Sequence, residues 1–124
     1  HRVWAYFPAT GNAVVFAGTG LAGGTGDGGQ ATSATLSQPF DVAVGLGALY
    51  VAERRGARVR KIDVSGVITR FAGTGVAGFN GDGGQATGTA LNQPSALAVD
   101  LTRNGEVYVT DRDNNRIRAI APRP

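Results

Sequence analysis

Short apolar or alternating runs, separated by glycine, proline and asparagine, make up this chain of 124 residues. Asp41 to Val44 is short and apolar, as expected of a strand covered on both faces. Ala48 to Ala52 is centred on a Tyr-Val pair, Arg58 to Ile62 alternates charged with aliphatic residues, and Val67 to Ala72 closes the series. Because only a few residues join these runs, we expect antiparallel neighbours in a sheet of four strands.

The same pattern is written twice along the chain. FAGTGLAGGTGDGGQATSATLSQPFDVAV, from Phe16 to Val44, returns 55 residues later as FAGTGVAGFNGDGGQATGTALNQPSALAV, from Phe71 to Val99. The register continues, because Glu106 to Thr110 matches Ala48 to Ala52. A repeat of this size indicates one structural unit stacked beside its copies. Four-stranded antiparallel units at this spacing are typical of propeller blades, so we predict an all-β propeller segment of about two blades.

The phase of the repeat divides the chain into blades and connectors. We assign residues 1–17 to the last strands of a preceding blade, 39–72 to a complete blade and 94–121 to an incomplete blade. Residues 18–38 and 73–93 are Gly-rich connector loops, called here the first and second connector. Since repeat folds generally need three or more units, we expect 1–124 to be a single partial propeller domain. Its expected partners are other blades, from the same parent chain or from an oligomer.

Each connector carries a Gly-Asp-Gly-Gly core, Gly26 to Gly29 and Gly81 to Gly84. Loops of this length are usually functional or packed on themselves. We expect their aspartates to accept backbone N–H bonds within the turn. The Ala-Thr-rich stretch that follows predicts one turn of helix, with Leu36 and Leu91 pointing into the core. The candidate interaction residues of these loops are Asp27, Gly28, Phe79, Asn80, Asp82 and Gly83.

The second unit resembles the repeats of NHL β-propellers. It has Pro94, then Ala98-Val99-Asp100, then Val107-Tyr108-Val109-Thr110-Asp111, and then Asn114-Asn115-Arg116-Ile117. The resemblance covers nearly the whole chain and implies that Asp111 stabilises the turn between strands and the neighbouring Arg116 by charge-assisted hydrogen bonds. The first unit departs from the pattern, with Gly45 in place of the first aspartate and Arg55-Gly56-Ala57-Arg58 at the turn, so a less regular turn is implied there.

Composition adds few constraints. Twenty glycines and 17% charged residues describe a chain rich in turns, and no apolar run approaches the length of a membrane helix. The chain has no cysteine, and therefore no disulfide or thiolate metal site. Its net charge is +3. The arginines repeat at one phase of the unit and form a candidate basic surface of Arg54, Arg58, Arg60, Arg112, Arg116 and Arg118.

The candidate cofactor and metal motifs lack the neighbouring residues or elements that such sites require. Gly18 to Gly23 and Gly73 to Gly78 both fit G-x-G-x-x-G, but a dinucleotide site needs a helix directly afterwards, and none is predicted. Asp111 to Asn115 resembles the start of a calcium-binding loop. Arg116 and Pro122, however, occupy the positions at which that loop requires glycine and glutamate. A cation bound by the Gly-Asp-Gly-Gly backbone stays open as an alternative. We predict no cofactor and no metal site.

An enzyme is difficult to build from these residues. The single histidine is His1, and covalent catalysis needs a nucleophile beside a base. Paired carboxylates remain an alternative, with Asp27, Asp41, Asp82 and Asp100 near one face of a ring. We therefore predict no catalytic residues.

The preferred function is a non-catalytic protein-interaction or structural module in a larger extracellular or surface assembly. One alternative is a fragment of a lyase-like or lactonase-like propeller enzyme with its catalytic residues in other blades. The second alternative is RNA binding by the basic face, as in some members of the resembled family; a half-solvated outer strand explains the same arginines.

Overall fold

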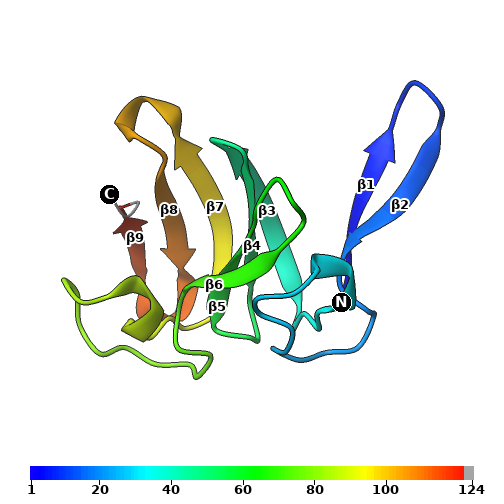
Figure 1. Cartoon of the computed structure of the whole chain (residues 1–124). Coiled ribbons are helices and arrows are strands. Elements are labelled where there is room, and N and C mark those ends of the chain that lie inside the picture. Colours follow the sequence, from blue (N-terminus) through cyan, green and yellow to red (C-terminus); the bar gives the residue numbers. More distant parts are fainter. Residues whose placement is uncertain (122–124) are drawn as a thin grey trace.

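Three antiparallel sheets form the molecule in the computed structural model, which describes residues 1–121 (Figure 1). The last three residues of the expected 1–124 domain lie outside the described residues. The first sheet is a hairpin of β1 (Val3–Phe7) and β2 (Asn12–Ala17). The other sheets have the strand orders β3-β4-β5-β6 and β7-β8-β9. The all-β propeller fold predicted from the repeat is thereby confirmed.

The four-stranded sheet consists of β3 (Pro39–Gly45), β4 (Ala48–Glu53), β5 (Arg58–Ile62) and β6 (Ile68–Ala72). Successive strands are hydrogen-bonded neighbours, because each connecting turn is too short for a crossover. The three-stranded sheet consists of β7 (Pro94–Asp100), β8 (Glu106–Asp111) and β9 (Arg116–Ile120). In the described part of the chain, β9 pairs with β8 alone, whereas its counterpart β5 pairs on both sides.

The turn after β4 keeps the strand register but lacks the 3₁₀ helix of its counterpart, because residues 54–57 form a plain turn whereas Arg112–Asn114 after β8 form η4. Glu53 pairs with Arg58 in the same register as Asp111 with Arg116. Ala57 adopts the left-handed conformation with φ 51°, close to the φ of 54° at Asn115. The last residue of the turn therefore keeps its conformation even though alanine tolerates it less well than asparagine.

The connectors contain the short helices predicted in them. The 3₁₀ helices η1 (Ala31–Ser33) and η2 (Ala86–Gly88) stand at matching positions of the repeat. Leu36 and Leu91, which follow them, are fully buried, as expected. Two further 3₁₀ turns, η3 (Leu101–Arg103) and η4 (Arg112–Asn114), bracket β8.

Two hydrophobic clusters hold the sheets and connectors together. The first cluster lies between β2, the first connector and the four-stranded sheet, and includes Leu36, Val51 and Ile68. The second lies between the four-stranded and three-stranded sheets and includes Tyr50 and Leu91. The tyrosine also meets Phe71 edge to face, with ring centroids 4.9 Å apart. Each connector therefore contributes a leucine to the core beneath the sheet that follows it.

The sheets stand side by side, and both connectors lie at the same end of them, at the bottom of Figure 1. The β1–β2 hairpin projects at one side and β9 lies at the other. No helix within residues 1–121 has the length and apolar character needed to cross a bilayer. The repeat thus presents its two long loops on one face, which is where a repeated site has to be sought.

Candidate functional site

A buried arginine fastens the first connector to the sheet above it. Arg60 lies on β5 with its side chain fully buried. Its Nε donates to Asp27 Oδ1 of the connector at 2.9 Å, and its Nη1 donates to Glu53 Oε2 of β4 at 3.1 Å. The guanidinium group also donates to the carbonyl oxygens of Thr35, at 3.0 Å, and Thr25, at 3.2 Å. Arg60, Glu53 and Asp27 are called here the first arginine cluster.

The second connector is fastened in the same way. Arg118 of β9 is 7% exposed, and its Nη1 donates to Asp111 Oδ2 of β8 at 2.8 Å. Its Nη2 lies 2.9 Å from Asp82 Oδ1 and donates to the Gly81 carbonyl oxygen at 2.9 Å, while Nη1 reaches the Ala90 carbonyl oxygen at 3.4 Å. Arg118, Asp111 and Asp82 form the second arginine cluster. Both clusters join two strands and a connector through the fork of donors that arginine supplies.

The buried carboxylates also hold the chain where it leaves each connector. Glu53 Oε1 accepts a hydrogen bond from the Ser37 N–H at 2.7 Å, and Asp111 Oδ1 accepts one from the Asn92 N–H at 2.7 Å. Burial raises the pKa of Glu53 above its ordinary value, while the Ser37 N–H and the positive charge of Arg60 oppose that increase. Within residues 1–121, no buried side-chain nitrogen or oxygen lacks a partner, so these buried charges are compensated.

These contacts correct two expectations. No backbone N–H within residues 1–121 is bonded to the carboxylate of Asp27 or Asp82; both pair with a buried arginine instead. Asp111 accepts a hydrogen bond from Asn114 Nδ2 in the turn, as expected, but it pairs with Arg118 and not with Arg116, its neighbour in register. The physical reason is burial, because Arg116 is exposed at the end of β9 whereas Arg118 extends beneath the sheet, where the buried carboxylate needs a cation.

The other predicted loop residues separate into two groups. Gly28 and Gly83 are exposed at the connector tips, with φ of 89° and 87°, values that favour glycine. Phe79 and Asn80 distinguish the second connector from the first. The Arg116 guanidinium carbon lies 4.2 Å from the Phe79 ring centroid, and Asn80 Oδ1 accepts a hydrogen bond from the Ala90 N–H at 2.9 Å.

The first connector has no such aromatic surface. Gly24 occupies the position that corresponds to Phe79, and a Cβ atom there would meet the guanidinium group of Arg58. Arg58 Nη1 instead donates to the Gly24 carbonyl oxygen at 3.4 Å. Of the two connectors, the second therefore carries a partly exposed aromatic ring, Phe79, with an arginine stacked on it.

The six candidate arginines do not share one surface. Arg60 and Arg118 are buried in the arginine clusters, where carboxylates pair with their charges. Arg54 is half-buried, and its guanidinium carbon lies 5.0 Å from the Phe40 ring centroid. The other three are half-buried or exposed, namely Arg58, Arg112 and Arg116.

The four aspartates considered for acid–base chemistry do not meet. Two of them belong to different arginine clusters. Asp41 Oδ2 accepts a hydrogen bond from the Leu97 N–H at 2.8 Å and so links β3 to β7. Asp100 Oδ1 accepts hydrogen bonds from the backbone N–H and the hydroxyl of Thr102, which lower its pKa below the ordinary value. Among residues 1–121, no three His, Cys, Asp or Glu side chains gather into a potential metal site.

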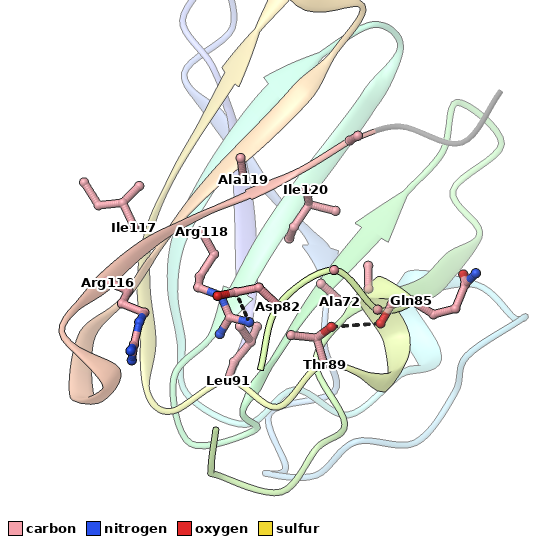
Figure 2. Close-up of a pocket in the computed structure, with 14 residues that line it drawn as sticks. Ala72, Asp82, Gln85, Thr89, Leu91, Arg116, Ile117, Arg118, Ala119 and Ile120 are labelled. Atoms are coloured by element: carbon pink, nitrogen blue, oxygen red, sulfur yellow. Dashed lines mark hydrogen bonds and ion pairs between the residues drawn. The ribbon is translucent and has the colours of Figure 1, made fainter. Parts of the chain in front are cut away.

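A groove of about 870 Å³ lies between β9, the second connector and the end of β6. Figure 2 shows Ile120 pointing into this groove toward Ala72, while Ile117 points to the other side of β9. Gly83, Gly84 and Ala86 form its rim on the connector side. This volume, called here the β9 groove, was not predicted from the sequence.

The arginine clusters were also missed, although their signal stands in the repeat. Arg60 and Arg118 occupy equivalent positions in the third strand, and Glu53 and Asp111 occupy equivalent positions in the second. A charged residue of opposite sign on neighbouring antiparallel strands, repeated in both units, indicates an internal pair. The alternation of charged and aliphatic residues suggested a solvated strand instead.

Comparisons with known proteins agree with this geometry. The family model described as NHL repeat matches residues 91–120, which include all of the three-stranded sheet. Teneurin-4 from Homo sapiens is 38% identical over 104 residues, a match that covers 73% of this chain and 4% of teneurin-4. "Protein SUPPRESSOR OF QUENCHING 1, chloroplastic" from Arabidopsis thaliana is 36% identical over 75 residues, covering 60% of this chain and 7% of that protein. The chain therefore spans only a small share of the length of these relatives.

A solved structure from Bacteroides thetaiotaomicron, described as a structural genomics protein of unknown function, has the same fold. It matches with a TM-score of 0.82 and 23% sequence identity, over 97% of this chain and 30% of that one. Three observations point to one assignment. The two larger sheets of this chain both have sequential antiparallel strands, the connector is repeated, and the family model matches. The chain belongs to the NHL-repeat family of β-propellers.

Proposed function

We propose that this chain is a non-catalytic NHL propeller module that acts as a protein-interaction or structural scaffold in a larger extracellular or surface assembly. The resemblance to teneurins is one support, since they match up to 91% of the chain. The other support is that the charged residues of the two arginine clusters contact one another inside the protein. The fold alone does not decide the function, so the argument must rest on the loops.

The observation that carries the proposal is the duplicated arginine cluster. In each cluster the arginine holds a long glycine-rich loop against a sheet through three polar contacts. Without such contacts, a loop of this composition loses much of its order, because glycine has the largest backbone entropy to lose. The two connectors are thereby presented as a row of ordered loops on one face. A preorganised surface of this kind suits recognition of another protein.

We assign the three sheets to successive blades of one propeller. The hairpin β1–β2 would be the last two strands of a preceding blade, β3 to β6 a complete blade and β7 to β9 the first three strands of the next. Residues 18–38 and 73–93 would be the connectors between blades. The equivalent strand registers of the two larger sheets support this division.

Within the row of loops, we assign the main contact to Phe79 together with Arg116. Aromatic and arginine side chains dominate the binding energy of many protein interfaces. Phe79 is 42% exposed, and Arg116 lies over its ring. The stacked pair offers a rigid apolar surface with a positive charge, which suits a protein partner with an apolar and acidic patch.

Binding to an array of purified extracellular domains, measured by biolayer interferometry, tests the proposal. The variant Phe79→Gly restores the residue found at the equivalent position of the first connector. We expect it to weaken binding about tenfold or more, because it removes a stacked aromatic anchor. Val76→Ala, an exposed change in the same connector, is the matched control and should alter affinity less than about twofold. Absence of any partner across the array, or turnover of lactone or phosphate ester substrates by the purified chain, would refute the proposal.

RNA binding by the basic face receives less support than the proposed function. Two of the six arginines that would form this face, Arg60 and Arg118, are enclosed in the clusters. The enzyme alternative needs catalytic residues from other blades, and no observation on this chain favours it.

A further inference from the structure

The turn between β3 and β4 contains a leucine in a backbone conformation that disfavours leucine. Leu46 and Gly47 both have positive φ, 49° and 76°. The counterparts in the second unit are Asn104 and Gly105, with φ of 57° and 82°. Asparagine and glycine are the residues that such turn positions favour, because both tolerate the left-handed region. The first unit therefore departs from ordinary turn chemistry at one position, Leu46.

Burial does not account for this leucine. The side chain of Leu46 is 63% exposed to solvent, so little hydrophobic stabilisation offsets the strain of its backbone. Strained non-glycine residues are concentrated at functional sites, where the strain serves a contact outside the local fold. An exposed leucine in a strained turn therefore points to recognition of another molecule.

A second exposed leucine lies across the junction between the two larger sheets. Leu101 of η3 is exposed like Leu46. A Cβ atom at Gly105 would lie 2.5 Å from Leu46 Cδ1, and one at Gly45 would lie 3.2 Å from Leu101 Cδ2. Each leucine thus leans on a glycine of the neighbouring sheet. Glycine at these two positions leaves room for the pair of side chains.

Val64 extends this apolar area along the first unit. It stands in the turn between β5 and β6, is exposed, and its Cγ1 would lie 3.5 Å from a Cβ atom at Gly47. Leu46, Val64 and Leu101 are called here the turn surface. The turns after β3 and β7 lie at the end of the sheets opposite the connectors (Figure 1). Because blades pack through their sheet faces, side chains at the tips of turns stay open to a partner.

The surroundings of the turn surface are acidic. The same turns and the strand positions next to them carry three carboxylates, of Asp63, Asp100 and Glu106, and one guanidinium group, of Arg103. The Arg103 Nε lies 3.8 Å from Asp100 Oδ2 and so already faces a carboxylate. Within residues 1–121, neither Asp63 nor Glu106 takes part in a salt bridge. The apolar side chains therefore have a rim with an excess of negative charge.

We propose that the turn surface docks a protein segment in which aliphatic side chains are flanked by lysine or arginine. The three aliphatic side chains supply the apolar centre, and the unpaired carboxylates attract the basic residues of the segment. An acidic segment is rejected by like-charge repulsion. This surface lies at the other end of the sheets from Phe79, so the inference goes beyond the contact that the proposed function assigns to the connectors.

Selection of random peptides displayed on phage, with the 124-residue chain as the target, tests the inference. We expect the recovered peptides to be enriched in leucine, isoleucine or valine next to lysine or arginine. Fluorescence anisotropy then measures their affinities for variants of the chain. Leu46→Asn should weaken binding about tenfold or more, because it removes the central side chain of the surface. The melting temperature of this variant should not fall, since asparagine is the residue of the equivalent turn.

The matched control is the same substitution at an equally exposed leucine. Leu21 is 70% exposed on the first connector, at the opposite end of the sheets, and Leu21→Asn should change affinity less than about twofold. On the peptide side, glutamine in place of lysine and arginine should weaken binding to the wild-type chain about fivefold or more. Sodium chloride at about 0.5 M should weaken binding of the unmodified peptide, because salt screens exposed charges.

Three results would overturn the inference. One is that no recovered peptide binds below about 1 mM. Another is that the recovered peptides bind Leu46→Asn and the wild-type chain equally well. The third is that the glutamine peptides keep full affinity for the wild-type chain, a result that does not depend on the folding of any variant. Peptides that lose affinity for Phe79→Gly and not for Leu46→Asn would refute this inference and leave the proposed function in place.

Discussion

Arg60 and Arg118 show how one residue type holds a loop to a sheet. Each guanidinium group reaches a carboxylate on the neighbouring strand, a carboxylate on the connector and carbonyl oxygens of the connector at the same time. Lysine has a single charged nitrogen and does not match this spread of acceptors. Because the carboxylates of Glu53 and Asp111 are fully buried, each arginine also supplies the charge that makes their burial tolerable.

Replacing the first of these arginines should destabilise the protein strongly. We expect Arg60→Met to lower the free energy of unfolding by about 3 to 5 kcal/mol, because it leaves Glu53 buried without its partner. The loss of unfolding free energy for Arg60→Lys should be smaller than the loss for Arg60→Met, because lysine keeps the charge. Arg112→Met, at an exposed position, is the control, and should change stability by less than about 0.5 kcal/mol. Urea unfolding followed by circular dichroism measures the difference; a loss below about 1 kcal/mol for Arg60→Met would contradict the structural role of the cluster.

The pH dependence of stability provides a second residue-level prediction. Hydrogen bonds from Thr102 lower the pKa of Asp100 below its ordinary value of 3.8. A lowered pKa in the folded state means that the contribution of Asp100 is fully present above about pH 4 and is lost as the pH falls through the folded-state value. The melting temperature of Asp100→Ala should therefore lie below that of the wild type at pH 6, and the gap should shrink near pH 2. A gap that stays constant over this range would show that the carboxylate charge is not involved.

At the scale of elements, strands were predictable and their long-range partners were not. The runs Ala48 to Ala52 and Arg58 to Ile62 correspond closely to β4 and β5, because period-two patterning and short turns are local properties. The helical turn before Leu36 was local too. The pairing of Asp27 with Arg60 joins positions 33 residues apart, and no local pattern states it. The β9 groove likewise depends on how a connector lies beneath a sheet.

The turns that follow β3 and β7 occupy equivalent positions in the two units. A residue of one turn can therefore be replaced by its counterpart from the other. Leu46 has φ 49° and its counterpart Asn104 has φ 57°. Leucine is strained in this left-handed conformation, whereas asparagine tolerates it. We expect Leu46→Asn to raise the free energy of unfolding by about 0.5 to 1 kcal/mol, and Asn104→Leu to lower it by a similar amount. Thermal unfolding of both variants measures this change; a loss of stability in Leu46→Asn would contradict the claim that Leu46 is strained.

At the scale of the whole molecule, the outer surfaces carry more apolar side chains than a monomer usually exposes. On β1, Trp4 and Tyr6 are 59% and 64% exposed, and Phe7 is 49% exposed. On β3, Phe40 and Val44 are also exposed. Contiguous apolar surface of this kind marks an interaction site in most soluble proteins. The propeller assignment accounts for it, because neighbouring blades cover such faces.

The central claim is that other blades cover these faces, and light scattering of the 124-residue chain across a range of concentrations tests it most directly. The account predicts a mass that rises above the 12.6 kDa of one chain as the concentration increases, because the exposed apolar faces associate. Trp4→Ser should weaken this association, because it removes apolar surface from the hairpin face. A stable, compact monomer of 12.6 kDa at every concentration would contradict the account.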